Sequence, residues 1–336
     1  MHTLTAKDFA SDQDVRWCPG CGDYSILKQV QTIMPDLGIP RENIVFISGI
    51  GCSSRFPYYM NTYGMHSIHG RATAVASGLK MMRKELSVWI ITGDGDSLSI
   101  GGNHLIHLLR RNLNVNILLF NNEIYGLTKG QYSPTSETGK HTKSSPWGAI
   151  DHPFNPAALA LGADATFVAR ALDRDPKGLR EVLLAAHQHQ GSAFVEIYQN
   201  CNVFNDGAFD AYSHKSEREL STLQLEAGQP LIYGPESQRI ALVIRDLQVY
   251  AKPLEECEPQ ELWIHNPHNL TKAHLLSRLF EHHGPSALPR PFGVLYQTQR
   301  PCYEDVLEEQ FHTAVAKKGS GQINQLLSGT NSWTIA

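Results

Sequence analysis

Four short apolar segments rich in β-branched residues recur in the first 205 residues, at positions 44–47, 88–91, 115–120 and 194–198. Such near-continuous apolar segments are typical of strands buried on both faces of a parallel sheet. Between them, apolar residues recur at helical spacing. The predicted helices carry Ile26, Leu27, Val30, Ile33 and Met34, then Ala74, Val75, Leu79 and Met82, then Leu105, Leu108 and Leu109. The pattern therefore predicts an α/β fold, a parallel sheet with helices on both faces.

Two further helices are predicted to begin at Asn155-Pro156 and Asp175-Pro176, where a capping residue precedes a proline. The alternation fades after about residue 205. Beyond it, helical spacing is visible near residues 275–280 and 306–315, with a proline-rich segment at 285–291 between them. We therefore predict a ligand-binding domain over residues 1–205, and a C-terminal extension over residues 206–336 that packs on it or on a partner subunit.

The composition is that of an ordinary globular protein, with 336 residues of which 41% are hydrophobic and 18% charged. A formal net charge of −4 gives no indication of a nucleic-acid surface. The N-terminus lacks the basic-then-apolar layout of a signal peptide, and no apolar segment is long enough to span a bilayer. We therefore expect a cytoplasmic protein with neither nucleic-acid nor membrane partners.

Polar motifs directly follow two of the predicted strands. Gly-Asp-Gly-Asp occupies residues 93–96, and Asn-Asn occupies residues 121–122. Because ligands bind beyond the carboxyl ends of parallel strands, both motifs should lie at one edge of the sheet. Asp94 and Asn122 offer hard oxygen ligands for Mg²⁺, which often completes its shell with phosphate oxygens, so we expect a diphosphate ester. Either motif alone would be interpreted as a strand-end turn.

The paired motifs resemble the Gly-Asp-Gly…Asn-Asn signature of thiamine diphosphate enzymes. That signature implies that Asp94, Asn122 and the backbone carbonyl of Ile124 hold Mg²⁺ on the diphosphate. Four further segments extend the likeness: Trp-Cys-Pro-Gly-Cys-Gly at 17–22, Gly-Ile-Gly-Cys-Ser-Ser at 49–54, His-Gly-Arg-Ala at 69–72, and Tyr-Gly-Leu-Thr-Lys-Gly-Gln-Tyr-Ser-Pro-Thr at 125–135. Together they resemble the β subunit of 2-oxoacid:ferredoxin oxidoreductases. The resemblance is dense between residues 15 and 146, continues to Cys201, and is thin afterwards.

The resemblance implies a set of residues around the cofactor. The implied cofactor-binding residues are Gly51, Ser53, Ser54, His69, Gly93, Asp94, Gly95, Asp96, Asn122, Leu127 and Thr128. The implied catalytic residues are His69, Thr128 and Lys129. The spacing of His66 and His69 would also suit a metal ion, or two ordinary hydrogen-bonded side chains. The resemblance favours His69 beside the thiazolium ring, as a polar contact or proton relay.

Six cysteines are too few for a fold held together by disulfides. The resemblance implies that four of them bind one four-iron four-sulfur cluster, namely Cys18, Cys21, Cys52 and Cys201. A structural zinc site is the alternative, because such sites also begin with Cys-x-x-Cys, but they more often use two tight pairs. Cys257 and Cys302 match no motif, and we expect both to be packing residues.

The resemblance also implies partners. Thiamine enzymes usually need a glutamate that hydrogen-bonds the aminopyrimidine ring, and in this family the α subunit supplies it. No glutamate of this chain stands in an equivalent motif. We therefore expect activity only with the α subunit, as a dimer of αβ pairs that converts a 2-oxoacid and coenzyme A to acyl-CoA and CO₂, with ferredoxin as electron acceptor. The alternatives are a non-redox thiamine decarboxylase or ligase with a structural zinc, and a non-catalytic scaffold subunit stabilised by zinc.

The expected substrate is inferred from Lys129. Relatives that accept 2-oxoglutarate, or a broad range of 2-oxoacids, carry a lysine at the matching position, and an ammonium group suits a substrate carboxylate. We therefore expect 2-oxoglutarate, with pyruvate as the alternative. The basic residues Lys80, Arg83 and Lys84 are interpreted as a solvated helix face rather than a ferredoxin dock.

Overall fold

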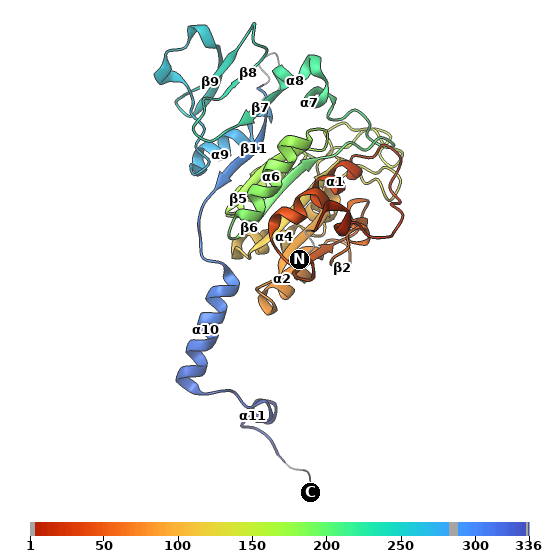
Figure 1. Ribbon diagram of the computed structural model, residues 1–336, viewed down its shortest axis with the longest axis vertical. Helices are drawn as coiled ribbons and strands as arrows, with labels where there is room; N and C mark the ends of the chain where they lie inside the picture. Colours follow the sequence, from red (N-terminus) through yellow and green to blue (C-terminus); the bar gives the residue numbers. More distant parts are fainter. Residues whose placement is uncertain (1–3, 282–287, 334, 336) are drawn as a thin grey trace.

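An eight-stranded sheet runs through the body of the computed structural model, which describes residues 4–281, 288–333 and 335 (Figure 1). Its strands, in order across the sheet, are β2 (Tyr63–His66), β1 (Ile44–Ser48), β3 (Ser87–Gly93), β4 (Val115–Asn121), β6 (Ser192–Tyr198), β5 (Phe167–Leu172), β11 (Arg290–Gln297) and β7 (Thr222–Leu225). Neighbouring strands are parallel except β11 and β5, which are antiparallel. The predicted parallel sheet and its four predicted strands, now β1, β3, β4 and β6, are confirmed.

Helices cover both faces of this sheet. Helices α1 (Asp23–Ile33) and α6 (Pro176–Gln188) lie on one face. Helices α2 (Ala72–Met82), α4 (Gly102–Arg111), α5 (Pro156–Gly162) and α9 (Leu270–Ser277) lie on the other. Successive side chains of a strand point to opposite faces, so Val45 and Ile47 of β1 join one core while Ile44 and Phe46 join the other. This two-sided burial explains why apolar residues are nearly continuous along β1, β3, β4 and β6.

Both proline-marked helix starts are confirmed. The Asn155 side chain accepts a hydrogen bond from the Ala158 amide at 3.0 Å and caps α5. The Asp175 side chain accepts one from the Gly178 amide at 3.2 Å and caps α6. In each case a side-chain oxygen satisfies an amide of the first turn that has no partner within the helix.

The second predicted helix is confirmed as α2, although not all of the apolar residues that marked it are buried. Ala74 and Met82 are exposed, and the buried face is made of small residues such as Ala72 and Ala76, which let the helix approach the sheet closely. Lys80 is buried as well, so its interpretation as part of a solvated helix face is wrong. Its Nζ donates to the carbonyls of residues 84 and 86, at 2.6 and 2.8 Å, where the helix has ended.

Residues beyond 205 add β7 and β11 to the main sheet and form a second sheet of three antiparallel strands. The second sheet consists of β8 (Ile232–Tyr233), β9 (Ile240–Arg245) and β10 (Gln248–Pro253). Short helices α7 (Asp210–Ser213) and α8 (Lys215–Ser221) precede it, and α3 (Asp94–Leu98) lies in the body. The extension therefore packs on the first part of the chain, while a domain boundary at residue 205 stays a prediction.

The last part of the chain extends away from the body as α10 (Tyr303–Lys318) and α11 (Ile323–Ser328) (Figure 1). The two late helical patterns are confirmed as α9 with the turn after it, and as α10. Of the proline-rich segment 285–291, residues 285–287 lie outside the described residues. The 3₁₀ helices are η1 (Ala6–Phe9), η2 (Met34–Leu37), η3 (Arg41–Asn43), η4 (Ser53–Tyr59), η5 (Leu254–Glu256), η6 (Pro259–Glu261) and η7 (Leu279–Glu281).

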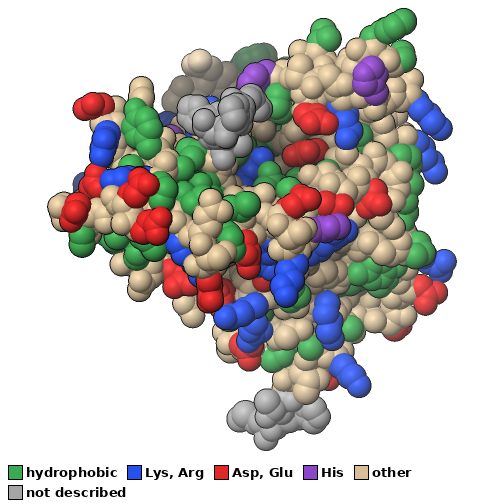
Figure 2. Space-filling view, turned by 90° about the horizontal axis from the view of Figure 1, so that it is seen from above, with side chains coloured by type: hydrophobic (Ala, Val, Ile, Leu, Met, Phe, Trp, Pro, Cys, Tyr) green, Lys and Arg blue, Asp and Glu red, His purple; other side chains and the backbone are tan. Residues whose placement is uncertain are grey.

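Acidic and basic side chains are interspersed over the end of the molecule that carries the small sheet (Figure 2). Such mixing agrees with the near-balanced formal charge of −4. Within the described residues, every helix is too short or too polar to cross a membrane.

Candidate functional site

A cavity of about 580 Å³ opens at the carboxyl ends of β1, β3 and β4. Of the predicted cofactor-binding residues, all but Ser54 line it, namely Gly51, Ser53, His69, Gly93, Asp94, Gly95, Asp96, Asn122, Leu127 and Thr128. Ile124 lines it too, so the three predicted Mg²⁺ ligands share one cavity. Ser54 is buried behind the wall, where its backbone carbonyl accepts a hydrogen bond from Ser48 Oγ at 2.7 Å.

Asp94 and Asn122 are brought together because β3 and β4 are parallel neighbours. Asp94 is 2% exposed, and its Oδ2 accepts hydrogen bonds from Thr135 Oγ1 at 2.7 Å and from Ser133 Oγ. Burial raises the pKa of Asp94 to about 6, although these two hydroxyls oppose the shift. Asn122 Oδ1 accepts from the Ile124 amide at 3.1 Å. A carboxylate, an amide oxygen and a backbone carbonyl beside an open cavity fit Mg²⁺ carrying a diphosphate.

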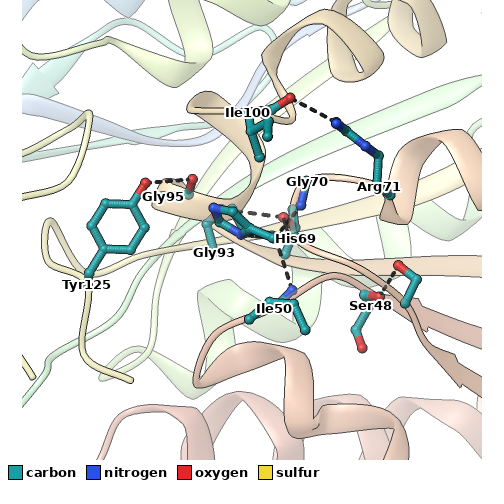
Figure 3. Close-up of polar contacts among 12 residues, drawn as sticks. Ser48, Ile50, His69, Gly70, Arg71, Gly93, Gly95, Ile100 and Tyr125 are labelled. Carbon is teal, nitrogen blue, oxygen red and sulfur yellow. Dashed lines mark hydrogen bonds and ion pairs between the residues drawn. The ribbon is translucent and has the colours of Figure 1, made fainter. Parts of the chain in front are cut away.

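Gly95 shows how tightly this wall is built. A Cβ at this position would lie 2.2 Å from Cε1 of Tyr125, so only glycine leaves room for that ring. The Tyr125 hydroxyl in turn donates to the Gly95 carbonyl at 3.0 Å (Figure 3). The loop that follows β4 is therefore fixed against the start of α3.

Asp96 lines the cavity, but its carboxylate is used within the protein. Oδ1 accepts from the amides of Ile50 and Gly70, at 3.0 and 2.7 Å, and lies 2.9 Å from His69 Nδ1 (Figure 3). Oδ2 accepts from Thr92 Oγ1 at 2.7 Å. Asp96 therefore joins the loops that follow β1 and β2. Because a carboxylate oxygen accepts, His69 Nδ1 is the donor, and the neutral ring presents Nε2 as an acceptor.

His66 and His69 have different surroundings, and only His69 lines the cavity. The His66 ring instead packs edge-on against Tyr58, with the ring centroids 5.5 Å apart. His69 lies at the cavity and is held by Asp96.

Cys18 and Cys21 precede α1, Cys52 follows β1, and Cys201 follows β6. A Cβ on Gly126 would lie 3.3 Å from Cys52 Sγ and 3.8 Å from Cys201 Sγ, so this glycine is packed against both thiols. Burial, then Asp23, Cys201 and Cys18, raises the pKa of Cys52 to about 12. The charges of Cys201 and Cys18 affect the pKa of Cys52, and those of Cys52 and Cys201 affect the pKa of Cys21, so the four thiols lie around a common space.

Four soft donors around one space fit an iron–sulfur cluster, in which each thiolate binds a different iron atom. In the described part of the chain, no group of three or more His, Cys, Asp or Glu side chains is arranged to hold a single metal ion. Cys257 and Cys302 lie elsewhere. Cys257 Sγ donates to the Pro253 carbonyl at 3.3 Å, and Cys302 is buried where α10 begins.

The loop after Tyr125 forms the open side of the cavity. Leu127, Thr128 and Gln131 line it, and Thr128 Oγ1 donates to Gln131 Oε1 at 2.6 Å. Lys129 is exposed and is not among the lining residues. Its φ of 84° is a left-handed conformation that costs a lysine free energy but would suit glycine. The role of Lys129 in substrate binding stays a prediction.

Several residues that hydrogen-bond to the predicted site residues were not predicted from the sequence. Ser133 and Thr135 stand inside the matched segment 125–135, so their place in a motif was a usable signal. Gln199 had no such signal. It contacts both Asn122 and Cys21, and these contacts exist only because β6 lies beside β4.

Comparison with known proteins agrees with the fold and the cavity. The family described as "Thiamine pyrophosphate enzyme, C-terminal TPP binding domain" matches residues 49–197. The chain is 53% identical to 2-oxoglutarate oxidoreductase subunit KorB of Mycobacterium tuberculosis, over 98% of this chain and 88% of that protein. It is 41% identical to the β subunit of 2-oxoacid:ferredoxin oxidoreductase 2 of Aeropyrum pernix, over 68% of this chain and 74% of the relative.

A solved structure gives the same result. The 2-oxoglutarate:ferredoxin oxidoreductase from Magnetococcus marinus, with 2-oxoglutarate, coenzyme A and succinyl-CoA bound, matches with a TM-score of 0.76 and 34% identity, over 98% of this chain and 96% of that one. The fold and the matched region thus define a thiamine-diphosphate-binding protein. More narrowly, the chain belongs to the β subunits of the 2-oxoacid:ferredoxin oxidoreductases, in the branch of the 2-oxoglutarate oxidoreductases.

Proposed function

We propose that this chain carries the thiamine diphosphate and one four-iron four-sulfur cluster of an enzyme that oxidises 2-oxoglutarate, with coenzyme A as acyl acceptor and ferredoxin as electron acceptor. The position of Cys52 is the main support for this proposal. This thiol lines the same cavity as Asp94 and Asn122, and it lies beside Cys201 across Gly126. A redox group held there would be next to the reacting cofactor, which a non-redox thiamine enzyme does not need.

Asp94, Asn122 and the Ile124 carbonyl would hold Mg²⁺ on the diphosphate. When bound, thiamine diphosphate supplies the nucleophilic carbon and the electron sink that decarboxylation requires. The protein supplies position: Ser133 and Thr135 fix one oxygen of Asp94, and the fixed loop after β4 holds Asn122. Cys18, Cys21, Cys52 and Cys201 would hold the cluster, which supplies a one-electron acceptor.

His69 is suited to handling a proton. Asp96 holds its Nδ1, so Nε2 is available to accept a hydrogen bond or a proton from a ligand in the cavity. Thr128 lines the same cavity, and its hydroxyl, which donates to Gln131 Oε1, could accept a hydrogen bond from a ligand. Lys129 would bind a substrate carboxylate after a change of side-chain position, because the residue is exposed at the edge of the cavity. Relatives named for 2-oxoglutarate support that acid over pyruvate.

A partner subunit would complete the site. Among the described residues that line the cavity, none is a glutamate, and the relatives are named as subunits. We therefore propose that an α subunit supplies the activating glutamate, in a dimer of αβ pairs. The cavity opens to the surface and can accept a contribution from a neighbouring chain.

Reconstitution with the α subunit tests this function. The αβ enzyme should reduce ferredoxin when 2-oxoglutarate, coenzyme A, thiamine diphosphate and Mg²⁺ are all present, and each omission should abolish reduction. The chain alone should show no turnover. Turnover by the isolated chain would contradict the partner requirement, and a strong preference for pyruvate would contradict the substrate.

A further inference from the structure

Gln199 lies buried between the two proposed cofactor sites. It directly follows β6 and is 1% exposed. Its Oε1 accepts a hydrogen bond from Asn122 Nδ2 at 3.0 Å. Its Nε2 lies 3.4 Å from Cys21 Sγ and donates to the Asn200 carbonyl at 2.5 Å. One side chain therefore touches a predicted Mg²⁺ ligand at one end and a predicted cluster ligand at the other.

The orientation of both amides follows from their partners. A backbone carbonyl only accepts, so the Gln199 atom facing Asn200 is the nitrogen, and Oε1 faces Asn122. Asn122 must then present its Nδ2 to Gln199. Its Oδ1 is left to accept from the Ile124 amide, as observed at 3.1 Å, and keeps a second lone pair for a metal ion. Gln199 thus selects which atom of Asn122 can act as a ligand.

The pairing of two strands fixes the positions of Asn122 and Gln199 relative to each other. Strands β4 and β6 pair in parallel with Asn121 opposite Tyr198, and the Gln199 amide donates to the Asn121 carbonyl at 3.0 Å. Asn122 and Gln199 are therefore the next residues along two strands whose register is fixed. The side-chain amide of Gln199 contacts Asn122, Cys21 and the Asn200 carbonyl, so it has little freedom to rotate.

We propose that Gln199 is a positioning residue for both cofactors, aiming the Asn122 oxygen at Mg²⁺ and donating an N–H to the Cys21 thiolate. The inference rests on the proposed function. Partners behind a metal ligand set its orientation and its affinity for the metal. Hydrogen bonds to cluster sulfurs stabilise the reduced state, which carries more negative charge, and so raise the midpoint potential. Gln199 would make the cluster next to the thiamine cavity easier to reduce.

Two substitutions in the αβ holoenzyme separate these effects. Gln199→Met fills similar space without either hydrogen bond. It should weaken thiamine diphosphate binding at fixed Mg²⁺ by roughly 10–100-fold and shift the midpoint potential of the cluster to more negative values. Gln199→Glu, at pH 8, keeps an acceptor for Asn122, replaces the N–H donor by an oxygen and adds negative charge beside Cys21, and the last two changes both disfavour reduction of the cluster. It should bind thiamine diphosphate nearly as the parent does, and its potential should also be more negative.

Gln190→Glu is the matched control, because exposed Gln190 also accepts a hydrogen bond from an asparagine amide, Asn114 Nδ2, at 3.1 Å. Gln190→Glu should change neither the affinity for thiamine diphosphate nor the midpoint potential of the cluster. Calorimetry measures binding, and a redox titration followed by electron paramagnetic resonance measures the potential. Parent-like affinity and potential in Gln199→Met would overturn the inference. If that variant does not fold, an unchanged potential in Gln199→Glu would overturn the cluster half. A parent enzyme with neither cofactor would instead refute the proposed function.

Discussion

Three side chains of the candidate site are held by residues from other segments of the chain. Hydroxyls of the loop after β4 hold Asp94, Asp96 holds His69, and Gln199 holds Asn122. The motif predicted which residues gather at the sheet edge. It did not predict that Ser133 and Thr135 contact one oxygen of Asp94 whereas both oxygens of Asp96 accept hydrogen bonds, because the two carboxylates differ only in their tertiary partners.

Asp94→Ala should abolish cofactor binding while the fold survives. Loss of a partner behind a ligand commonly costs 10–100-fold in metal affinity, so loss of the ligand itself should cost at least about 100-fold. Burial raises the pKa of Asp94 from 3.8 to about 6. The native state therefore holds its proton more tightly than the unfolded state, and the free energy of unfolding falls as pH rises from about 4 to 6. Above pH 6 the ionised carboxylate opposes folding.

Without cofactor, Asp94→Ala should accordingly melt no lower than the parent at pH 8. Calorimetric titration with thiamine diphosphate and Mg²⁺, together with thermal unfolding, checks both expectations. Asp12→Ala, at an exposed aspartate, is the control and should bind normally. Stoichiometric cofactor on folded Asp94→Ala would remove Asp94 from the ligand set.

Lys129→Ala should lower the catalytic efficiency of the αβ enzyme on 2-oxoglutarate. One charge-assisted contact is worth about 1.5–3 kcal/mol, which is roughly 10–150-fold in efficiency. Lys129→Gly should lose as much activity, even though glycine relaxes the backbone at a φ of 84°. Lys129→Arg should retain most of it. Lys143, another exposed loop lysine, provides the control substitution to alanine. Equal efficiency for Lys129→Ala and the parent would place Lys129 outside the site.

Among the elements, the four strands with near-continuous apolar segments were predictable, and β5, β2 and β11 were not. Arg170 interrupts the apolar pattern of β5, yet it is fully buried because its Nε donates to Glu196 Oε2 of β6 at 2.8 Å. The cross-strand register places these two residues opposite each other. Strand β2 is exposed at the sheet edge and lacks an apolar pattern. Strand β11 pairs with β5 across more than a hundred residues, so no local signal marks it.

His189 at the end of α6 should make stability depend on pH. Burial lowers its pKa to about 4 from 6.5. Thr166 Oγ1 gives its hydrogen to Asn112 Oδ1 at 2.5 Å and so accepts one from neutral His189 Nε2 at 2.8 Å. The unfolded state binds the proton more tightly between pH 4 and 6.5. The His189 contribution to the free energy of unfolding should therefore fall by at most about 3 kcal/mol as pH drops through that range, opposite in sign to the Asp94 contribution.

Urea unfolding of the parent and of His189→Gln at several pH values measures this dependence. The variant should lack the His189 contribution, so its free energy of unfolding relative to that of the parent should rise as pH drops from 6.5 to 4. His312→Gln, on exposed α10, should keep the parent's pH dependence. Identical pH dependence in His189→Gln and the parent would show that other groups are responsible.

For the whole molecule, the sequence predicted a cofactor-binding domain over residues 1–205 and an extension that packs on it or on a partner subunit. It did not predict that the extension supplies two strands of the main sheet, or that α10 and α11 lead away from the body. Those features depend on contacts between distant residues. The grouping of the cysteines is of the same kind, since segments before α1, after β1 and after β6 meet only in the folded chain.

Serine substitution of each cysteine tests this grouping. Cys18, Cys21, Cys52 and Cys201 should each be needed for normal iron incorporation, whereas Cys257→Ser and Cys302→Ser should retain it. Cys302 is the stricter control because it is also buried. Iron and sulfide content per chain is the measurement. A requirement for Cys257 or Cys302, with Cys201 dispensable, would contradict the proposed ligands.

An iron–sulfur cluster beside the thiamine cavity distinguishes the proposed function from its alternatives. The visible absorption spectrum of the anaerobically purified chain, with its metal content, shows whether this cluster is present. The proposal predicts a brown protein with about four iron atoms per chain and a broad absorption that bleaches when dithionite is added. A colourless protein that contains stoichiometric zinc would contradict it, and would instead support a zinc-stabilised subunit without redox function.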